Sequence, residues 1–103
     1  MSKFSVPRNT VARHLRDSKG NPIGLAAAFQ GPSGDVTVGW AFVAKADRKV
    51  GSINKLKSWQ IAFGRAVKGT EAKIPAALIP VVEEVRQRAV RYFRVDAGRV
   101  RVV

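Results

Sequence analysis

The chain has 103 residues, of which 46% are hydrophobic, and this size and apolar fraction fit one globular domain spanning residues 1–103 rather than two. Nineteen Lys and Arg against seven Asp and Glu give a formal net charge of +12, which exceeds what solubility needs and predicts a polyanionic partner. The lack of cysteine excludes disulfides and thiolate metal sites and favours a reducing, cytoplasmic location.

The first 45 residues predict three antiparallel strands joined by turns. Residues 10–16 form the first strand, although the spacing of Val11 and Leu15 also suits a short helix. A polar turn precedes the second strand, 23–30, in which alternate residues share one buried face: Ile23, Leu25, Ala27 and Phe29. The third strand, 36–45, follows the turn Gly31 to Asp35 and places Val36, Val38, Trp40 and Phe42 on one face, with Thr37, Ala41 and Val43 on the other.

Two helices follow. The first covers residues 53–68, with Ser52 as N-cap and Gly69 as terminator, and its apolar arc is Ile53, Leu56, Trp59, Phe63, Ala66 and Val67. Gly64 within it either costs stability or signals close backbone packing. The second helix covers residues 80–93 with Pro80 in its first turn, unless Pro75 and Pro80 share one longer, kinked helix. Its core stripe is Val82, Val85, Ala89, Tyr92 and Phe93.

These elements predict the α+β class, with a three-stranded antiparallel meander packed against two helices. The inner face of the sheet and the apolar arcs of both helices make the core. After Gly98 the tail alternates strictly and could add a short C-terminal edge strand, within the domain or with a second copy in a homodimer, or it could be a mobile basic end.

Unpaired positive charge is concentrated between Lys45 and Lys68, where the only acid is Asp47. Three of these cations lie opposite the apolar arc of the first helix, spaced so that they could follow a phosphate backbone. In the second helix Glu84 and Glu83 are spaced to pair with Arg88 and Arg91, so those arginines are partly structural. The predicted nucleic-acid contacts are therefore Lys45, Arg48, Lys49, Lys55, Lys57, Arg65 and Lys68, with Arg99 and Arg101 as secondary contacts.

The sequence contains few residues in patterns that are typical of catalytic sites. His14 is the only histidine, the acids show no metal-ligand spacing, and no glycine-rich phosphate loop precedes a helix. The aromatic residues sit at core positions by periodicity, although they could also serve as stacking platforms. No run approaches the roughly 20 apolar residues of a bilayer span, and the N-terminus has no signal-peptide core. We expect no enzyme, no cofactor, no metal and no membrane partner, with a metal-dependent nuclease as the remote alternative.

Residues 42–47 (FVAKAD) and 55–65 (KLKSWQIAFGR) resemble a pattern in small tailed-bacteriophage proteins. In those proteins a strand leads into a Lys-Asp loop and a basic helix that ends Ile-Ala-x-Gly-Arg. Here Ala46 splits the Lys-Asp pair, and Ser58 stands where the pattern has glycine. The resemblance implies a bacteriophage origin, and hence the cytoplasm of an infected bacterium, but little about activity.

The sequence therefore predicts a nucleic-acid-binding protein that contacts mainly phosphates and has low sequence specificity. DNA and RNA remain open as partners. The alternative is a phage-type interaction module that binds an acidic surface of a host protein and modulates it, in which the charge serves steering and complementarity.

Overall fold

The computed structural model describes residues 10–43, 55–70 and 72–102; the predicted Ser52 cap and the end of the third predicted strand lie outside these ranges. Strands β1 (Thr10–Arg16), β2 (Pro22–Gln30) and β3 (Val36–Phe42) form an antiparallel meander. Strand β4 (Val100–Val102) pairs in parallel with β3, giving the order β1-β2-β3-β4. The α+β class and the C-terminal edge strand are confirmed, and residues 10–16 form a strand rather than a helix.

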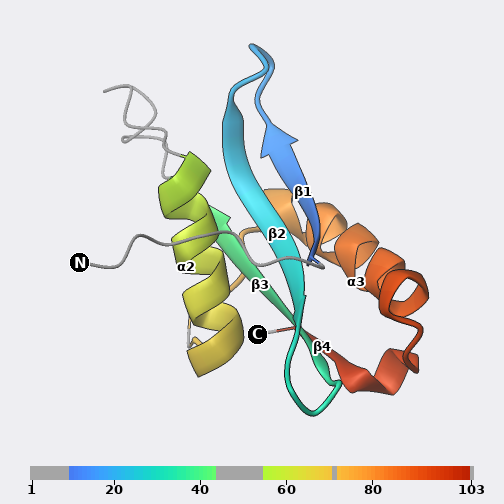
Figure 1. Cartoon of the computed structure of the whole chain (residues 1–103). Helices are drawn as coiled ribbons and strands as arrows, with labels where there is room; N and C mark the ends of the chain where they lie inside the picture. Colours follow the sequence, from blue (N-terminus) through green and yellow to red (C-terminus); the bar gives the residue numbers. More distant parts are fainter. Residues whose placement is uncertain (1–9, 44–54, 71, 103) are drawn as a thin grey trace.

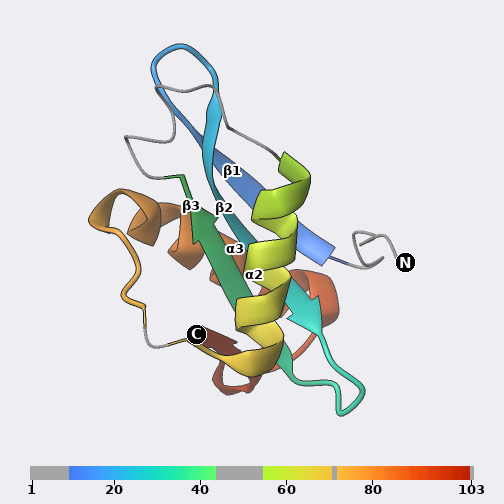
Figure 2. The same ribbon diagram turned by 90° about the vertical axis from the view of Figure 1, so that its left-hand side faces the viewer.

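The two α-helices of the described chain cover opposite faces of this sheet (Figures 1 and 2). Helix α2 (Lys55–Lys68) contacts β3 and β2, whereas α3 (Ile79–Phe93) contacts all four strands. The expectation that both helices share one inner face is therefore wrong. Its physical reason lies in β2, which is buried on both faces from Ile23 to Phe29 and so needs a cover on each side.

The larger core lies between the sheet and α3. Val36, Val38 and Trp40 of β3 point to this side with Phe42, as their alternation predicts. They pack against a stripe on and just before α3 made of Leu78, Val81, Val82, Val85 and Ala89. Val81 extends the predicted stripe, while Tyr92 lies outside it because this residue is 55% exposed.

The smaller core lies between the sheet and α2. It joins Leu25 and Ala41 to Ala62, and the Phe29 ring meets Trp59 and Phe63 edge to face. A Cβ at Gly39 would overlap the backbone carbonyl oxygen of Ala62, so β3 and α2 approach as closely as their backbones allow. The predicted arc is wrong at Val67, which is 64% exposed because it borders a surface hollow rather than the packed core.

The segments that join these elements follow the predicted turn chemistry. Gly69 ends α2 with a positive φ of 78°, and its N–H donates to the carbonyl of Arg65. Pro75 precedes a 3-10 turn at Ala76–Leu78, and Pro80 lies in the first turn of α3, so one longer kinked α-helix does not form. A Cβ at Gly64 would meet nothing within 4 Å, so the close approach is at Gly39 instead.

Candidate nucleic-acid interface

The predicted basic region lies partly outside the described chain. Lys45, Arg48 and Lys49 fall in the range 44–54, and of Lys55 only the backbone is described, at the start of α2. Lys57 and Lys68 are exposed on the outer side of α2, eleven residues apart. That separation is roughly 16 Å along a helix axis, so these two lysines could follow a phosphate backbone only as separate contacts.

Arg65 is turned away from that outer side and toward β3. Its Nη1 donates to the carbonyl oxygen of Trp40 at 2.9 Å, and its guanidinium carbon lies 4.1 Å from the centre of the Trp40 ring. Desolvation by burial lowers the pKa of Arg65 from its ordinary value. The guanidinium thus has one internal hydrogen bond and one internal ring contact.

The two predicted arginines of the C-terminal segment lie in different settings. Arg99 donates from Nε to Asp35 at 2.9 Å and from Nη2 to the carbonyl of Ser33 at 3.0 Å, so it fastens the β2–β3 turn. Arg101 lies in β4, opposite Thr37 of β3, and its side chain is exposed. Paired residues of neighbouring strands project to the same face, so Arg101 belongs to the α2 side of the sheet.

Helix α3 carries the arrangement that sequence spacing did not predict. Glu83 pairs with Arg86, and Glu84 pairs with Arg13 of β1 rather than with Arg88. These bonds lower the pKa of Glu83 and raise those of Arg86 and Arg13. The predicted ion pairs of Arg88 and Arg91 are therefore wrong, because a strand residue 71 positions away in sequence takes Glu84. Within the described chain neither arginine has an acidic partner.

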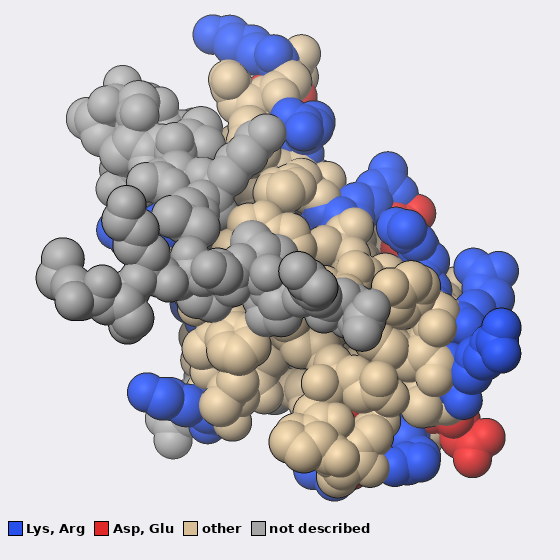
Figure 3. Space-filling model, in the orientation of Figure 1, with Lys and Arg blue, Asp and Glu red and all other residues tan. Residues whose placement is uncertain are grey.

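Arg88 and Arg91 share a surface hollow with an exposed aromatic ring. Together with Tyr92 and with Val11 of β1 they line a hollow of about 280 Å³, and we call these four residues the Tyr92 flank. The Tyr92 ring meets Phe93 edge to face, with ring centres 4.9 Å apart. Figure 3 shows Lys and Arg side chains gathered over α3, on the right of the view. Sequence periodicity assigns Tyr92 to the core. The sequence feature that could have indicated this site is the spacing of Arg88 and Tyr92, which are four residues apart and therefore on the same side of the helix.

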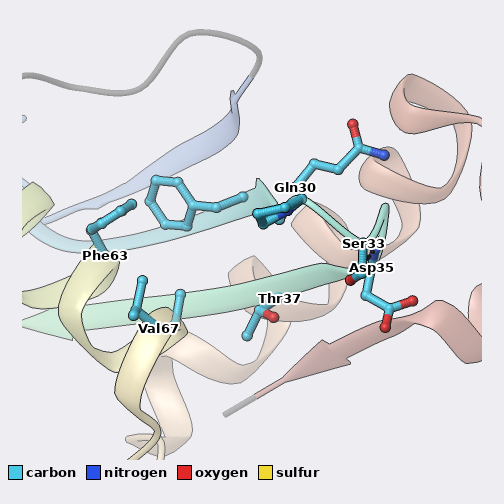
Figure 4. A pocket seen from close by; sticks show the side chains of 10 residues that line it. Gln30, Ser33, Asp35, Thr37, Phe63 and Val67 are labelled. Carbon is cyan, nitrogen blue, oxygen red and sulfur yellow. Dashed lines mark hydrogen bonds between the residues drawn. The ribbon is translucent and has the colours of Figure 1, made fainter.

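A second hollow, of about 380 Å³, lies between the C-terminal half of α2 and the β2–β3 turn (Figure 4). Phe29, Phe63 and Val67 give it apolar walls. Two of its polar side chains are already engaged, since Gln30 donates to the carbonyl of Gly34 and Asp35 accepts from Arg99. This hollow therefore offers mainly apolar contact.

Among the described residues, no group of three or more His, Asp or Glu side chains is placed to hold a metal ion. The Tyr92 flank offers guanidinium donors and an aromatic ring, which suit phosphates and planar groups. Within the described ranges, neither α-helix has the length and apolarity needed to cross a membrane.

Comparison with protein-family models, with curated proteins and with solved structures finds no match.

Proposed function

We propose that this protein binds nucleic acid, chiefly through phosphate contacts and with little sequence preference. The observation that carries the proposal is the pairing on α3. Both glutamates of the helix are bonded to Arg86 and Arg13, which leaves Arg88 and Arg91 facing solvent beside Tyr92. A formal net charge of +12 supplies the long-range attraction for a polyanion.

Guanidinium groups suit this role because each presents several N–H donors in a fixed plane to phosphate oxygens. Every phosphate neutralised releases condensed counterions, so affinity falls as salt rises. Contacts of this kind position a protein on nucleic acid but carry no sequence information. We therefore propose a binding protein without catalytic activity or cofactor, for DNA or RNA.

The basic residues of α2 and β4 are proposed as additional contacts on the other side of the sheet. Lys57, Lys68 and Arg101 are exposed there, and Lys45, Arg48, Lys49 and Lys55 stay predicted contacts. Arg65 and Arg99 contribute less in this proposal, because their guanidinium groups bond to Trp40 and to the β2–β3 turn. A ligand on the Tyr92 flank therefore need not contact α2.

The test is a fluorescence-anisotropy titration of the purified protein against duplex DNA, single-stranded DNA and RNA of equal length at several salt concentrations. We expect submicromolar binding at low salt. The slope of log affinity against log salt should be about −0.9 per phosphate contact for duplex and about −0.7 for single strands. Binding weaker than about 10⁻⁴ M near physiological salt, the weak end of non-specific affinity, would contradict the proposal.

The second candidate is a bacteriophage protein that binds an acidic surface of a host protein and modulates it. The exposed Tyr92 beside two arginines favours it, because Tyr and Arg are enriched at the energetic centres of protein interfaces. A pull-down from nuclease-treated bacterial lysate separates the two functions. Recovery of one acidic protein in stoichiometric amount, with no nucleic-acid binding, would support the second.

A further inference from the structure

We propose that the Tyr92 flank binds single-stranded nucleic acid by stacking one unpaired base on the Tyr92 ring, while Arg88 and Arg91 contact the neighbouring phosphates. This inference rests on the proposed nucleic-acid binding and adds the kind of strand and the role of the ring.

The ring of Tyr92 is both exposed and held in place. Tyr92 is 55% exposed, although it lies in the last turn of α3, a helix whose inner stripe is buried. Phe93 packs against the larger core, between the sheet and α3. Its ring meets the Tyr92 ring with the two ring planes at 90°. Such a contact uses one edge or one face of the tyrosine ring, so at least one face remains for another planar group.

The two arginines lie where phosphates next to a stacked base would be. Arg88 is four residues before Tyr92, one helical turn away on the same side, and Arg91 is its neighbour toward the solvent side of α3. Both line the same hollow as the ring, and within the described chain neither bonds to an acid. The charged groups around the ring therefore favour a phosphate-bearing ligand over a neutral aromatic one.

The size of the hollow favours one small planar group. Its volume of about 280 Å³ lies just below the range of roughly 300 to 1,000 Å³ that is typical of pockets for drug-sized ligands. Val11 adds an apolar wall from β1. In a duplex both faces of each internal base are covered by its neighbours, so only an unpaired base can place a face on the tyrosine.

The first experiment uses the fact that Tyr92 is the only tyrosine in the chain. Protein labelled with 3-fluorotyrosine gives a single ¹⁹F resonance, which is followed during titration with a thymidine oligonucleotide and with a duplex of equal length. We expect a saturable shift of the resonance with the single strand and little change with the duplex. Equal shifts with both ligands, or no shift with a bound single strand, would overturn the inference.

The second experiment compares Tyr92→Leu with Tyr92→Phe, which keeps an aromatic face. Tyr92→Leu should weaken single-strand binding by about 5- to 150-fold, the range typical of losing one base-stacking contact, and duplex binding by less than about 2-fold. Tyr92→Phe should bind both ligands nearly as the parent does. Equal losses on both ligands, in variants with unchanged circular dichroism, would contradict stacking.

These results distinguish this inference from the proposed function on which it depends. If the parent protein binds duplex and single strand alike, and Tyr92→Leu changes neither, stacking is excluded while phosphate binding stands. If the parent binds no nucleic acid, both proposals fail and the acidic-protein alternative gains support.

Discussion

Arg65 of α2 contacts Trp40, whose ring belongs to the core on the other side of the sheet. The guanidinium donates to the Trp40 carbonyl at 2.9 Å and lies 4.1 Å from the ring centre. Strand β4 pairs with β3 only over residues 36–38, so it does not cover β3 at Trp40. Arg65 therefore links α2, on one face of the sheet, to the core between the sheet and α3 on the other face.

Replacing Arg65 by Ala should destabilise the fold while leaving ligand binding nearly intact. The lost hydrogen bond and cation–π contact predict a decrease in the free energy of unfolding of about 1–2 kcal/mol. For a domain of this size each kilocalorie corresponds to roughly 4–8 °C in Tm. Thermal denaturation measures the first effect and anisotropy the second. A normal Tm with a large loss of affinity would instead place Arg65 on the ligand.

Substitution of Gly39 by Ala should disturb the contact between β3 and α2. The new Cβ would overlap the Ala62 carbonyl oxygen and lie 2.8 Å from its carbonyl carbon, so the helix must shift. Overpacking of this kind costs about 1–3 kcal/mol. Gly64→Ala in the same helix is the matched control, because nothing lies within 4 Å of a Cβ there. It should raise stability by up to about 1 kcal/mol; urea unfolding that ranks the variants in the reverse order would refute this packing.

The stability of the β1–β2 turn should depend on pH through Asp17. Its carboxylate accepts backbone N–H groups of Asn21 and Lys19, both at 2.9 Å, and the bond from Asn21 is the main reason that the Asp17 pKa is lowered. A lowered pKa in the folded state adds stability above the ordinary aspartate value of about 3.9, and this is lost as pH falls through the folded value. The stability gap between the parent and Asp17→Asn should therefore close in acid. A gap that widens below pH 4 would contradict this assignment.

Glu84→Gln should strengthen nucleic-acid binding. The change removes a negative charge beside Arg88 and releases Arg13 from its ion pair. We expect affinity to rise about two- to fivefold at low salt and the difference to shrink at high salt. Glu83→Gln removes the same charge from a residue that pairs with Arg86, outside the Tyr92 flank. Equal gains in the two variants would mean that only net charge matters.

Local pattern predicted the elements well and their assembly less well. Alternation in β3 placed Val36, Val38 and Trp40 together on one face, as the structure confirms. The continuous burial of β2 depends on alanines at 26 and 28, whose small side chains gave no clear signal for a second covered face. Because the second buried face of β2 is not evident from the sequence, the sequence predicts both helices on the same face of the sheet.

The candidate site was harder to predict because it depends on contacts between distant segments. Spacing within α3 suggested that Glu84 pairs with Arg88, but Arg13 of β1 takes the carboxylate. Periodicity likewise placed Tyr92 in the core, since a residue at the margin of an apolar stripe can face either way. Both outcomes depend on how α3 packs against β1. That packing cannot be predicted from the local sequence of either element.

The central claim, that the Tyr92 flank is the main nucleic-acid contact, is tested most directly by two double charge reversals. Arg88→Glu with Arg91→Glu changes the flank, whereas Lys19→Glu with Lys73→Glu lowers the net charge equally at exposed positions elsewhere. Affinities are compared by anisotropy after circular dichroism shows that both variants are folded.

We predict that the flank variant loses at least about 10-fold in affinity and shows a shallower salt slope, while the control loses much less, because only the flank variant removes direct phosphate contacts. Equal losses in the two variants, or an unchanged flank variant, would contradict the account.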